Sequence, residues 1–236
     1  MGSSQKKFRH ELKYYINEYE YEMLRKRVQL VLKRDKNSVD EEGYHIRSLY
    51  FDNVYDNDLF EKNYGILKRK KYRIRIYNCS DQVIRIERKN RVGEYICKES
   101  AALTREEYEA IMNWEYDFLK SKENPLCKDF YLHLRSEQMS PRVIVDYVRE
   151  AYVGNISDVR ITFDKKLQAS VNSTDIFDPN LVTVEALSSP VLIMEVKFNE
   201  FLPTYIRDVI QLNSHHRSAI SKYVICRVAS MRHYTP

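Results

Sequence analysis

The sequence predicts an α+β protein in which a closed antiparallel β-barrel is covered on its outside by amphipathic helices. Many predicted strands have one apolar face and one face that carries Lys, Arg and an isolated Glu, with the period of two that strands require. Other segments have the single apolar stripe of a helix that packs against a core. Closing the sheet places its charged face inside the barrel and leaves no exposed edge strand.

Length and composition are consistent with one domain. The 236 residues are 43% hydrophobic, and no repeat or low-complexity linker divides them, so we treat residues 1–236 as a single domain. The four cysteines form no CxxC pair, which argues against a thiolate metal site or a disulfide framework. No apolar run approaches the ~20 residues of a membrane span, and the N-terminus has no apolar signal region. We therefore expect a cytoplasmic protein without a membrane span.

The strands are predicted from short segments that alternate charged or polar residues with apolar ones. Residues 8–16 (FRHELKYYI) place Glu11 and Lys13 on one face, and residues 191–198 (VLIMEVKF) do the same with Glu195 and Lys197. In chain order, the predicted strands are residues 8–16, 44–52, a hairpin over 68–91, 94–99, 142–153, 158–164, 182–186 and 191–198.

Helices are predicted where a capping signal precedes an apolar stripe. Asn17 with Glu20, and Thr104 with Glu107, have the spacing of a capping box, so a helix should begin after each N-cap residue. We expect the second helix to continue to about residue 119. Two further helices are predicted over residues 126–139 and from residue 203 to about 212, each opened by a proline at its first turn.

The hairpin over residues 68–91 carries most of the positive charge of the chain. Its 10 Lys and Arg against 2 Asp and Glu give +8 in 24 residues, whereas the whole chain carries +5. One face of the first strand carries Lys71, Arg73, Arg75 and Tyr77, and one face of the second carries Arg85, Glu87, Lys89 and Arg91. Such a face is ordinarily exposed to solvent. Because like charges side by side destabilise a sheet, the pattern also favours a polyanion bound among them.

A barrel with cations on its inner face must hold anions, because unpaired buried charges cost too much free energy in a dry interior. The few carboxylates on that face then have a role as well. One of them can hold a divalent cation, Mg²⁺ or Mn²⁺, that bridges phosphate oxygens. The barrel is thus predicted to be a wet tunnel for phosphates.

Eight short segments carry a resemblance to a known family. In chain order they are FRHELKYYI, SLYFDN, KYRIRIY, IERK, DYVREAY, VRITFD, IMEVKF and SKYV. With these segments in this order, the chain resembles the VTC domain, the catalytic module of the polyphosphate polymerase in the vacuolar transporter chaperone complex. That domain belongs to the triphosphate tunnel metalloenzymes, which are related to the CYTH phosphatases. The resemblance extends over nearly the whole chain and implies the tunnel fold.

The resemblance also implies roles for individual residues. The residues expected to bind substrate phosphates are Lys13, Arg73, Arg75, Lys89, Tyr147, Arg149, Arg160 and Lys222. Of these, Lys222, Arg73 and Arg75 are the expected catalytic residues. Glu195 is the expected ligand of the Mn²⁺ or Mg²⁺ ion. Glu11 and Glu87 either bind the metal or only form ion pairs with the cations.

Three functions fit these residues. The first is metal-dependent transfer of a phosphoryl group from ATP to a growing inorganic polyphosphate chain. The second is hydrolysis of a triphosphate such as inorganic tripolyphosphate on the same scaffold, and the third is binding of polyphosphate or a nucleotide without turnover. The expected partners are ATP or another triphosphate, and inorganic polyphosphate. Nucleic acid is not expected, because the cations alternate with buried positions and no exposed aromatic platform accompanies them.

Overall fold

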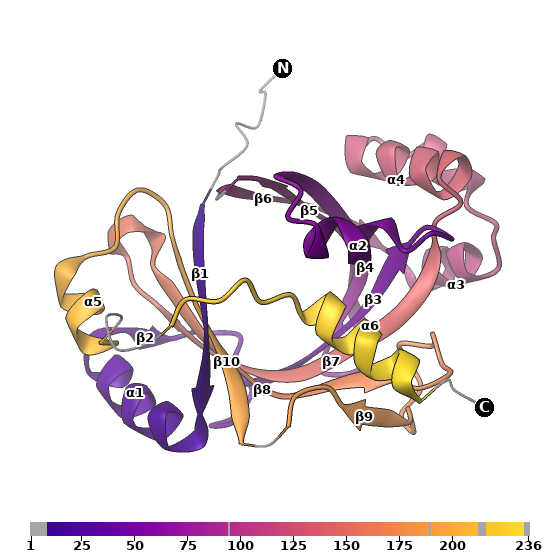
Figure 1. The fold of residues 1–236 in the computed structure, drawn as a ribbon. Coiled ribbons are helices and arrows are strands. Elements are labelled where there is room, and N and C mark those ends of the chain that lie inside the picture. The colour runs from indigo at the N-terminus through magenta and orange to yellow at the C-terminus, as the bar shows by residue number, and fades with distance from the viewer. Residues whose placement is uncertain (1–8, 94, 189, 212–215, 234–236) are drawn as a thin grey trace.

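A large antiparallel sheet curls around a central space in the computed structural model, which describes residues 9–93, 95–188, 190–211 and 216–233 (Figure 1). The strands are β1 (His10–Asn17), β2 (Lys33–Arg34), β3 (Tyr44–Asp52), β4 (Lys68–Tyr77), β5 (Ser80–Val92), β6 (Tyr95–Leu103), β7 (Ser140–Val153), β8 (Arg160–Ser170), β9 (Thr183–Glu185) and β10 (Val191–Phe198). Each predicted strand overlaps the observed ones, with differences at the ends: Arg9, Asp158, Val159, Val182 and Ala186 lie outside the strands, and Phe8 and Glu94 are outside the described residues.

The α+β class is confirmed, but a closed barrel is not. Eight strands follow the order β1-β10-β8-β7-β3-β4-β5-β6, while β2 pairs with β7 and β9 with β8. The two edge strands β1 and β6 form no ladder in the described part of the chain. They meet at one isolated bridge, where Arg9 and Ile96 exchange backbone hydrogen bonds of 3.0 and 3.2 Å.

The chain before the last helix lies along the free edge of β1. Tyr14 and Arg217 form an isolated bridge, and the Ser218 amide donates to the Lys13 carbonyl over 2.9 Å. Figure 1 shows this segment, in yellow, crossing the opening of the curled sheet on its way to helix α6. The free edge of β1 is therefore covered in part by this segment.

The helices begin where the capping signals predict. They are α1 (Glu18–Val31), α2 (Asn57–Asn63), α3 (Arg105–Met112), α4 (Pro125–Ser136), α5 (Thr204–Val209) and α6 (Lys222–Arg232), with 3₁₀ turns at Asp117–Lys120 and Ile156–Asp158. The capping boxes at the starts of α1 and α3 are both formed. The predicted length of α3 is wrong: it ends at Met112, because Trp114 takes a left-handed conformation with φ of 65° that interrupts the helix.

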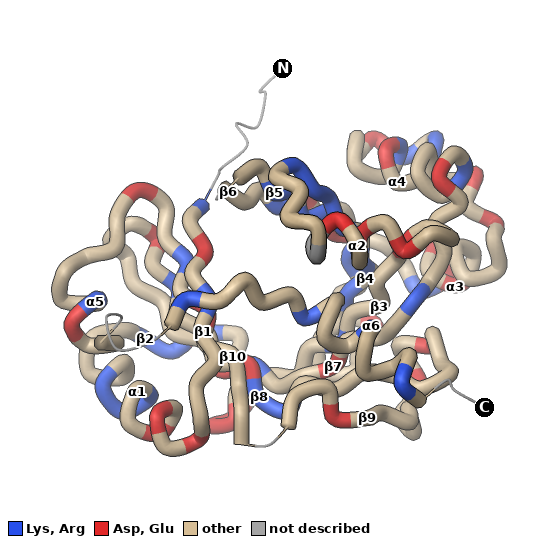
Figure 2. Tube along the Cα trace, viewed as in Figure 1, with Lys and Arg blue, Asp and Glu red and all other residues tan. Residues whose placement is uncertain are grey.

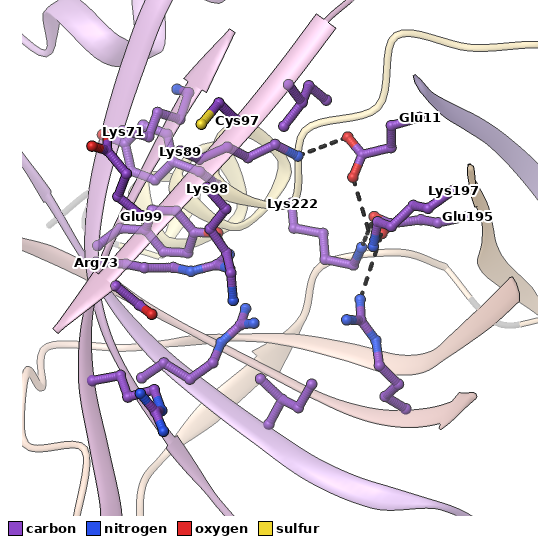
Figure 3. A pocket seen from close by; sticks show the side chains of 18 of the residues that line it. Glu11, Lys71, Arg73, Lys89, Cys97, Lys98, Glu99, Glu195, Lys197 and Lys222 are labelled. Atoms are coloured by element: carbon purple, nitrogen blue, oxygen red, sulfur yellow. Dashed lines mark hydrogen bonds and ion pairs between the residues drawn. The ribbon is translucent and has the colours of Figure 1, made fainter. Parts of the chain in front are cut away.

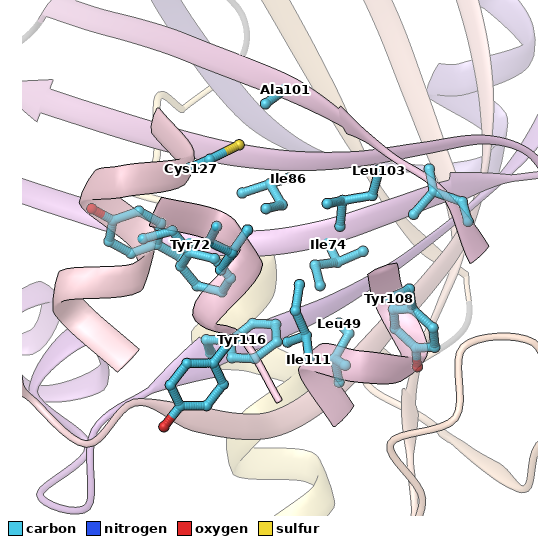
Figure 4. Close-up of a cluster of buried hydrophobic side chains, with 14 of the residues drawn as sticks. Leu49, Tyr72, Ile74, Ile86, Ala101, Leu103, Tyr108, Ile111, Tyr116 and Cys127 are labelled. Atoms are coloured by element: carbon cyan, nitrogen blue, oxygen red, sulfur yellow. The ribbon is translucent and has the colours of Figure 1, made fainter. Parts of the chain in front are cut away.

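Apolar clusters on the convex face fix the orientation of the hairpin strands. Ile74 of β4 and Ile86 of β5 are fully buried against Tyr108 and Ile111 of α3 (Figure 4). Burying a large aliphatic side chain contributes ~1.5–3 kcal/mol, and a register slip of one residue would exchange these side chains for charged ones. The charged faces of β4 and β5 are thereby turned toward the central space.

Helix α6 packs against the concave face of the sheet. On β7, Val145 shares a face with Tyr147 and Arg149, which line the central space. Val145 also belongs to one buried cluster with Tyr223 and Cys226 of α6. Leu59 of α2 belongs to the same buried cluster. The expectation that all helices pack outside the sheet is wrong for α6, which covers one part of the inner face. No helix in the described residues is long and apolar enough to span a bilayer.

Candidate functional site

A cavity of about 1570 Å³ occupies the concave face of the sheet. The cationic side chains that line it are Arg9, Lys13, Arg69, Lys71, Arg73, Arg75, Arg85, Lys89, Arg91, Lys98, Arg149, Arg160, Lys197 and Lys222. Among the described lining residues, the acidic ones are Glu11, Glu99 and Glu195. Figure 2 shows Lys and Arg gathered along β4 and β5. This cavity is suited to a multiply charged anion.

All of the predicted phosphate-binding residues line this one cavity, as do Glu11 and Glu195. They come from seven elements of the fold that are far apart in the sequence. Glu87 lies behind the cavity surface, 1% exposed, where Arg73 covers it. The structure thus brings the predicted residues together, and their roles in binding and catalysis stay predictions.

Strands β1 and β10 place acids and bases opposite one another. Their antiparallel register sets Glu11 across from Lys197 and Lys13 across from Glu195. Each strand carries the segment Glu-x-Lys, so antiparallel pairing of the two segments necessarily aligns each Glu with a Lys. Shorter contacts join Lys197 to Glu195 of the same strand, at 2.6 Å, and Lys89 of β5 to Glu11, at 2.7 Å (Figure 3). Across the two strands, the Lys13 ammonium lies 3.4 Å from Glu195 and the Lys197 ammonium lies 3.7 Å from Glu11. This is the cross-strand ion pairing expected of such segments.

Lys222 enters the same cluster from the first turn of α6, where the Ser221 side chain caps the helix. Its ammonium lies 2.6 Å from Glu195 and 2.5 Å from Asp164 of β8. Arg149 of β7 binds Asp164 through two nitrogens, at 2.6 and 2.8 Å. We call the following group the carboxylate wall: Glu11, Lys13, Arg149, Asp164, Glu195, Lys197 and Lys222.

The other side of the cavity is formed by the hairpin of β4 and β5. We call the following group the hairpin wall: Arg69, Lys71, Arg73, Arg75, Arg85, Glu87, Lys89 and Arg91. Arg73 is neutralised by Glu87 at 2.6 Å and also donates to the Tyr50 hydroxyl over 2.7 Å. Arg75 donates to Ser48 and to the Tyr147 hydroxyl, at 2.9 and 3.2 Å.

The hairpin wall holds like charges directly opposite one another. The cross-strand partners are Arg69 with Arg91, Lys71 with Lys89, and Arg75 with Arg85. Such pairs destabilise a sheet unless an anion lies between them. The hairpin is therefore arranged to accept phosphate oxygens, for which the arginine forks have matching geometry.

The two walls shift the pKa values of their groups in different ways. Burial alone would raise the pKa of Glu195, but Lys197 and Lys222 outweigh it and hold that pKa well below the usual range. Burial lowers the pKa of Lys89 to about 7, although Glu11 opposes the change. Burial likewise lowers the pKa of Lys71 to about 8. At neutral pH the three carboxylates of the carboxylate wall are ionised, because neighbouring cations lower their pKa values. Two lysines of the hairpin wall are close to losing their protons.

The carboxylates could hold a divalent cation only if phosphate oxygens supply some of its other ligands. Within the described residues, no three His, Cys, Asp or Glu side chains group as metal ligands. Glu11 and Glu195 lie on neighbouring strands and both line the cavity. Mg²⁺ is commonly held by one or two carboxylates, with substrate phosphates and water as the other ligands. Both oxygens of Glu195 are also engaged by lysines, so a cation bound there must share them.

Arg160 is set apart from the other predicted residues. Its guanidinium lies 2.5 Å from Asp35 and donates to the Tyr44 hydroxyl over 2.9 Å. The prediction missed Lys197 and Asp164 as site residues. Lys197 could have been found from the second Glu-x-Lys segment, and Asp164 from its place on the Arg160 face of its strand, two residues beyond Thr162.

Comparisons with known proteins agree with the fold. The sequence model of the VTC domain family matches residues 8–231. A search of curated proteins finds no match. A solved structure from Bacillus halodurans, provisionally named an adenylate cyclase, shares 11% identity with a TM-score of 0.51, over 88% of this chain and 88% of that chain. A Vibrio parahaemolyticus structure with the same provisional name shares 12% identity with a TM-score of 0.51, over 94% and 98% of the two chains. At these identities the likeness is one of fold alone.

Proposed function

This chain belongs to the VTC domain family, and we propose that it transfers a phosphoryl group from ATP to a growing inorganic polyphosphate chain inside its basic cavity. The observation that carries the proposal is the pairing of the two walls in one cavity. One wall offers ionised carboxylates beside lysines, and the other offers a row of cations in excess. The triphosphate that donates the phosphoryl group needs the first environment, and the long anionic acceptor needs the second.

Phosphoryl transfer needs positioning and charge neutralisation more than covalent help from the protein. Arg73 and Arg75 would orient the phosphates, because each offers a planar fork of donors at the cavity surface. Arg75 is buried, and Arg73 is held by Glu87. Lys222, held between Glu195 and Asp164, would place a fixed positive charge at the transferred phosphate. Lys13 lies 3.4 Å from Glu195 on the same side and adds a second charge.

A divalent cation, Mn²⁺ or Mg²⁺, held by Glu195 with Glu11 would neutralise triphosphate oxygens and polarise the breaking bond. The protein residues supply the rest of the arrangement. Glu195 is 3% exposed and fixed by four cationic neighbours, so it presents its oxygens to the cavity from one position. The terminal phosphate of a polyphosphate chain would attack in line with the leaving ADP.

Hydrolysis of a triphosphate is the second candidate, because water in place of the acceptor phosphate would use the same residues. The row of cation pairs along the hairpin favours the polymerase, since it runs from Arg69 to Arg75 along β4 and suits an anion longer than a triphosphate. A third outcome is binding without turnover.

The test is to incubate the purified protein with ATP and Mn²⁺ or Mg²⁺ while measuring ADP, free phosphate and long-chain polyphosphate together. We expect ADP and polyphosphate with little free phosphate. Free phosphate equal to ADP would identify a triphosphatase instead. If no ADP forms while polyphosphate still binds, the protein is a binding module and the catalytic proposal is wrong.

A further inference from the structure

Outside the cavity, Cys79, His45 and Asp146 form a chain of contacts. The Cys79 sulfur lies 3.4 Å from Nδ1 of His45, and Nε2 of His45 pairs with Oδ1 of Asp146. His45 follows Tyr44, which lines the cavity, so on the pleated strand β3 it points to the opposite face. Asp146 of β7 likewise precedes Tyr147 of the cavity. The proposed function gives the three residues of this chain no role.

The contacts of His45 decide which of its nitrogens can take a proton. A carboxylate only accepts hydrogen bonds, so the proton of the neutral imidazole lies on Nε2, toward Asp146. Nδ1 is then an acceptor, and the Cys79 thiol is the donor that faces it. A nucleophile within reach of a base, with the base oriented by a third group, is the arrangement that activates a thiol.

The backbone holds Cys79 beside this base. Strands β4 and β5 are joined by a two-residue loop of Asn78 and Cys79. The Asn78 amide donates to the His45 carbonyl over 3.0 Å, and the His45 amide donates to the Asn78 side-chain oxygen over 2.9 Å. Cys79 has a φ of 53°, in the left-handed region where such loops usually carry glycine. The loop therefore carries a thiol at a position where glycine would be less strained.

Asp146 is held in place by Arg47. The two residues are direct cross-strand partners, and Nε and one terminal nitrogen of Arg47 each lie 3.0 Å from Oδ2 of Asp146. The side chains of Asp146 and Arg47 are 5% and 7% exposed, that of His45 is 29% exposed, and Cys79 is exposed. The buried ion pair thus fixes the imidazole, while a reagent can reach the thiol from solvent.

The surroundings of Cys79 disfavour a free thiolate. Partial burial raises the pKa of the thiol; Arg47 lowers that pKa and Asp146 raises it, and the net shift is upward. Because the thiolate is the species that reacts, a thiol of raised pKa is unreactive by itself. The proton must therefore pass to His45 when the sulfur reacts, and the Asp146 carboxylate would stabilise the imidazolium that results.

We propose that Cys79 is a site of thiol–disulfide exchange, with His45 as its general base and Asp146 as the residue that positions this base. Cys79 gives its proton to Nδ1 of His45, and its sulfur forms a bond with one sulfur of a small-molecule disulfide. The S–S bond of that disulfide breaks, and the departing thiolate takes the proton from His45. The products are a mixed disulfide at Cys79 and one free thiol.

A disulfide fits this site better than an acyl group does. Exchange develops no oxyanion, so it needs no further donors beyond the three residues, whereas acyl transfer depends on such donors. The inference does not depend on the proposed function, because none of the three residues lines the cavity.

The proposal is tested by the rate at which the purified, reduced protein reacts with dithiodipyridine. This disulfide is neutral, so the cations of the cavity do not attract it. The release of thiopyridone is followed from about pH 6 to about pH 9. We expect one thiol to react quickly, because Cys97, Cys127 and Cys226 are buried. Cys79→Ser should abolish this fast phase.

His45→Gln is the decisive variant. It should slow the fast phase at neutral pH by at least about tenfold, because general acid–base assistance typically contributes more than that. Its rate should then rise about tenfold per pH unit, as for a thiol that ionises unaided, and the rate of the unmodified protein should depend less on pH. Asp146→Asn should slow the reaction less, since an amide oxygen still accepts from Nε2 but carries no charge. His233→Gln, at the exposed C-cap of α6, is the control and should change nothing.

The same experiment reports whether each variant keeps its fold. Unfolding would expose the three buried cysteines, so a folded variant still shows at most one fast thiol. If His45→Gln and the unmodified protein react at equal rates over the whole pH range, Cys79 is an ordinary exposed thiol and the proposal is wrong. A fast phase that survives in Cys79→Ser would overturn it as well.

Discussion

The two walls of the cavity differ in how far their charges are neutralised within the protein. The carboxylate wall sets four cations against three carboxylates, and each carboxylate contacts at least two cations. The hairpin wall contains seven cations and one carboxylate, Glu87, and opposes like charges in three cross-strand pairs, although Lys89 also contacts Glu11 of the other wall. The first wall is electrostatically satisfied without a ligand, and the second is not.

This difference indicates which part of the site has its final geometry before substrate binds. The carboxylate wall is preorganised, so its geometry can serve chemistry in which positions must be fixed. The cations of the hairpin wall repel one another until a polyanion binds between them. Relief of this repulsion contributes to the free energy of binding. Neutralising a paired cation of the carboxylate wall and neutralising a member of a like-charge pair on the hairpin wall should therefore change the stability of the unliganded protein with opposite signs.

Lys222→Gln should have the largest effect, on the preorganised wall. It leaves Asp164 and Glu195 buried with one cation fewer, and removing one partner from a buried ion pair costs ~3–5 kcal/mol. The measurement is urea denaturation of the unliganded protein. Lys128→Gln, an exposed lysine on α4, is the control and should change the free energy of unfolding by less than about 0.5 kcal/mol. Equal stability of the two variants would show that the carboxylate wall is not a coupled unit.

Glu195→Gln should separate catalysis from binding. Losing the carboxylate should lower metal-dependent turnover about 10²–10³-fold, the loss typical when a preorganised group that stabilises the transition state is removed. Metal-free binding of tripolyphosphate should stay equal or become tighter, because Lys13, Lys197 and Lys222 lose a competing anion.

The control for this experiment is Glu185→Gln, an exposed position on β9 outside the cavity. It should leave both turnover and binding unchanged. Full activity of the Glu195→Gln protein would remove this residue from the proposed metal site.

Binding to the hairpin wall should weaken as pH rises above 7. In the unliganded protein the pKa of Lys89 is about 7, and bound phosphates raise it because they favour the ammonium form. Between the pKa of Lys89 in the free protein and its higher pKa in the complex, binding is accompanied by uptake of one proton. In this range the affinity falls by up to about tenfold for each pH unit of increase. Affinity for tripolyphosphate should be measured from pH 7.5 to 9, where the phosphate itself is largely ionised.

Lys89→Arg is the matched variant, because arginine stays charged throughout this range. It should flatten the pH dependence and leave the smaller slope from Lys71, whose pKa is about 8. An unchanged slope would show that Lys89 does not titrate with ligand binding.

Arg85→Gln should have the smallest effect, and it should be stabilising. Arg85 lies opposite Arg75, so neutralising it removes a like-charge pair worth ~0.2–1 kcal/mol. The gain in the urea midpoint of the unliganded protein should shrink at high salt, which screens the repulsion. Arg73→Gln on the same wall should instead destabilise, because it strips Glu87 of its closest cation. Destabilisation by Arg85→Gln would contradict the view that the hairpin is strained without a ligand.

Local sequence determined much of the fold and the composition of the site. Period-two alternation placed Arg73 and Arg75 on the cavity face and Ile74 on the core face, because a strand offers only two faces and the apolar one must be buried. The capping signals at Asn17 and Thr104 set the starts of two helices through contacts within three residues. Such features need no knowledge of distant parts of the chain.

Tertiary structure alone decided which charges meet. Periodicity puts Glu195 on a face but does not say that Lys13 lies opposite it, or that Lys222 reaches it from a helix 27 residues later in the chain. The closure of the barrel was likewise beyond the sequence pattern: in the described residues β1 and β6 form no ladder and are joined by a bridge of Arg9 with Ile96, and α6 packs inside the curve of the sheet. The physical reason is that contacts between distant segments depend on the register and twist of the whole sheet, which the packing of many side chains fixes together.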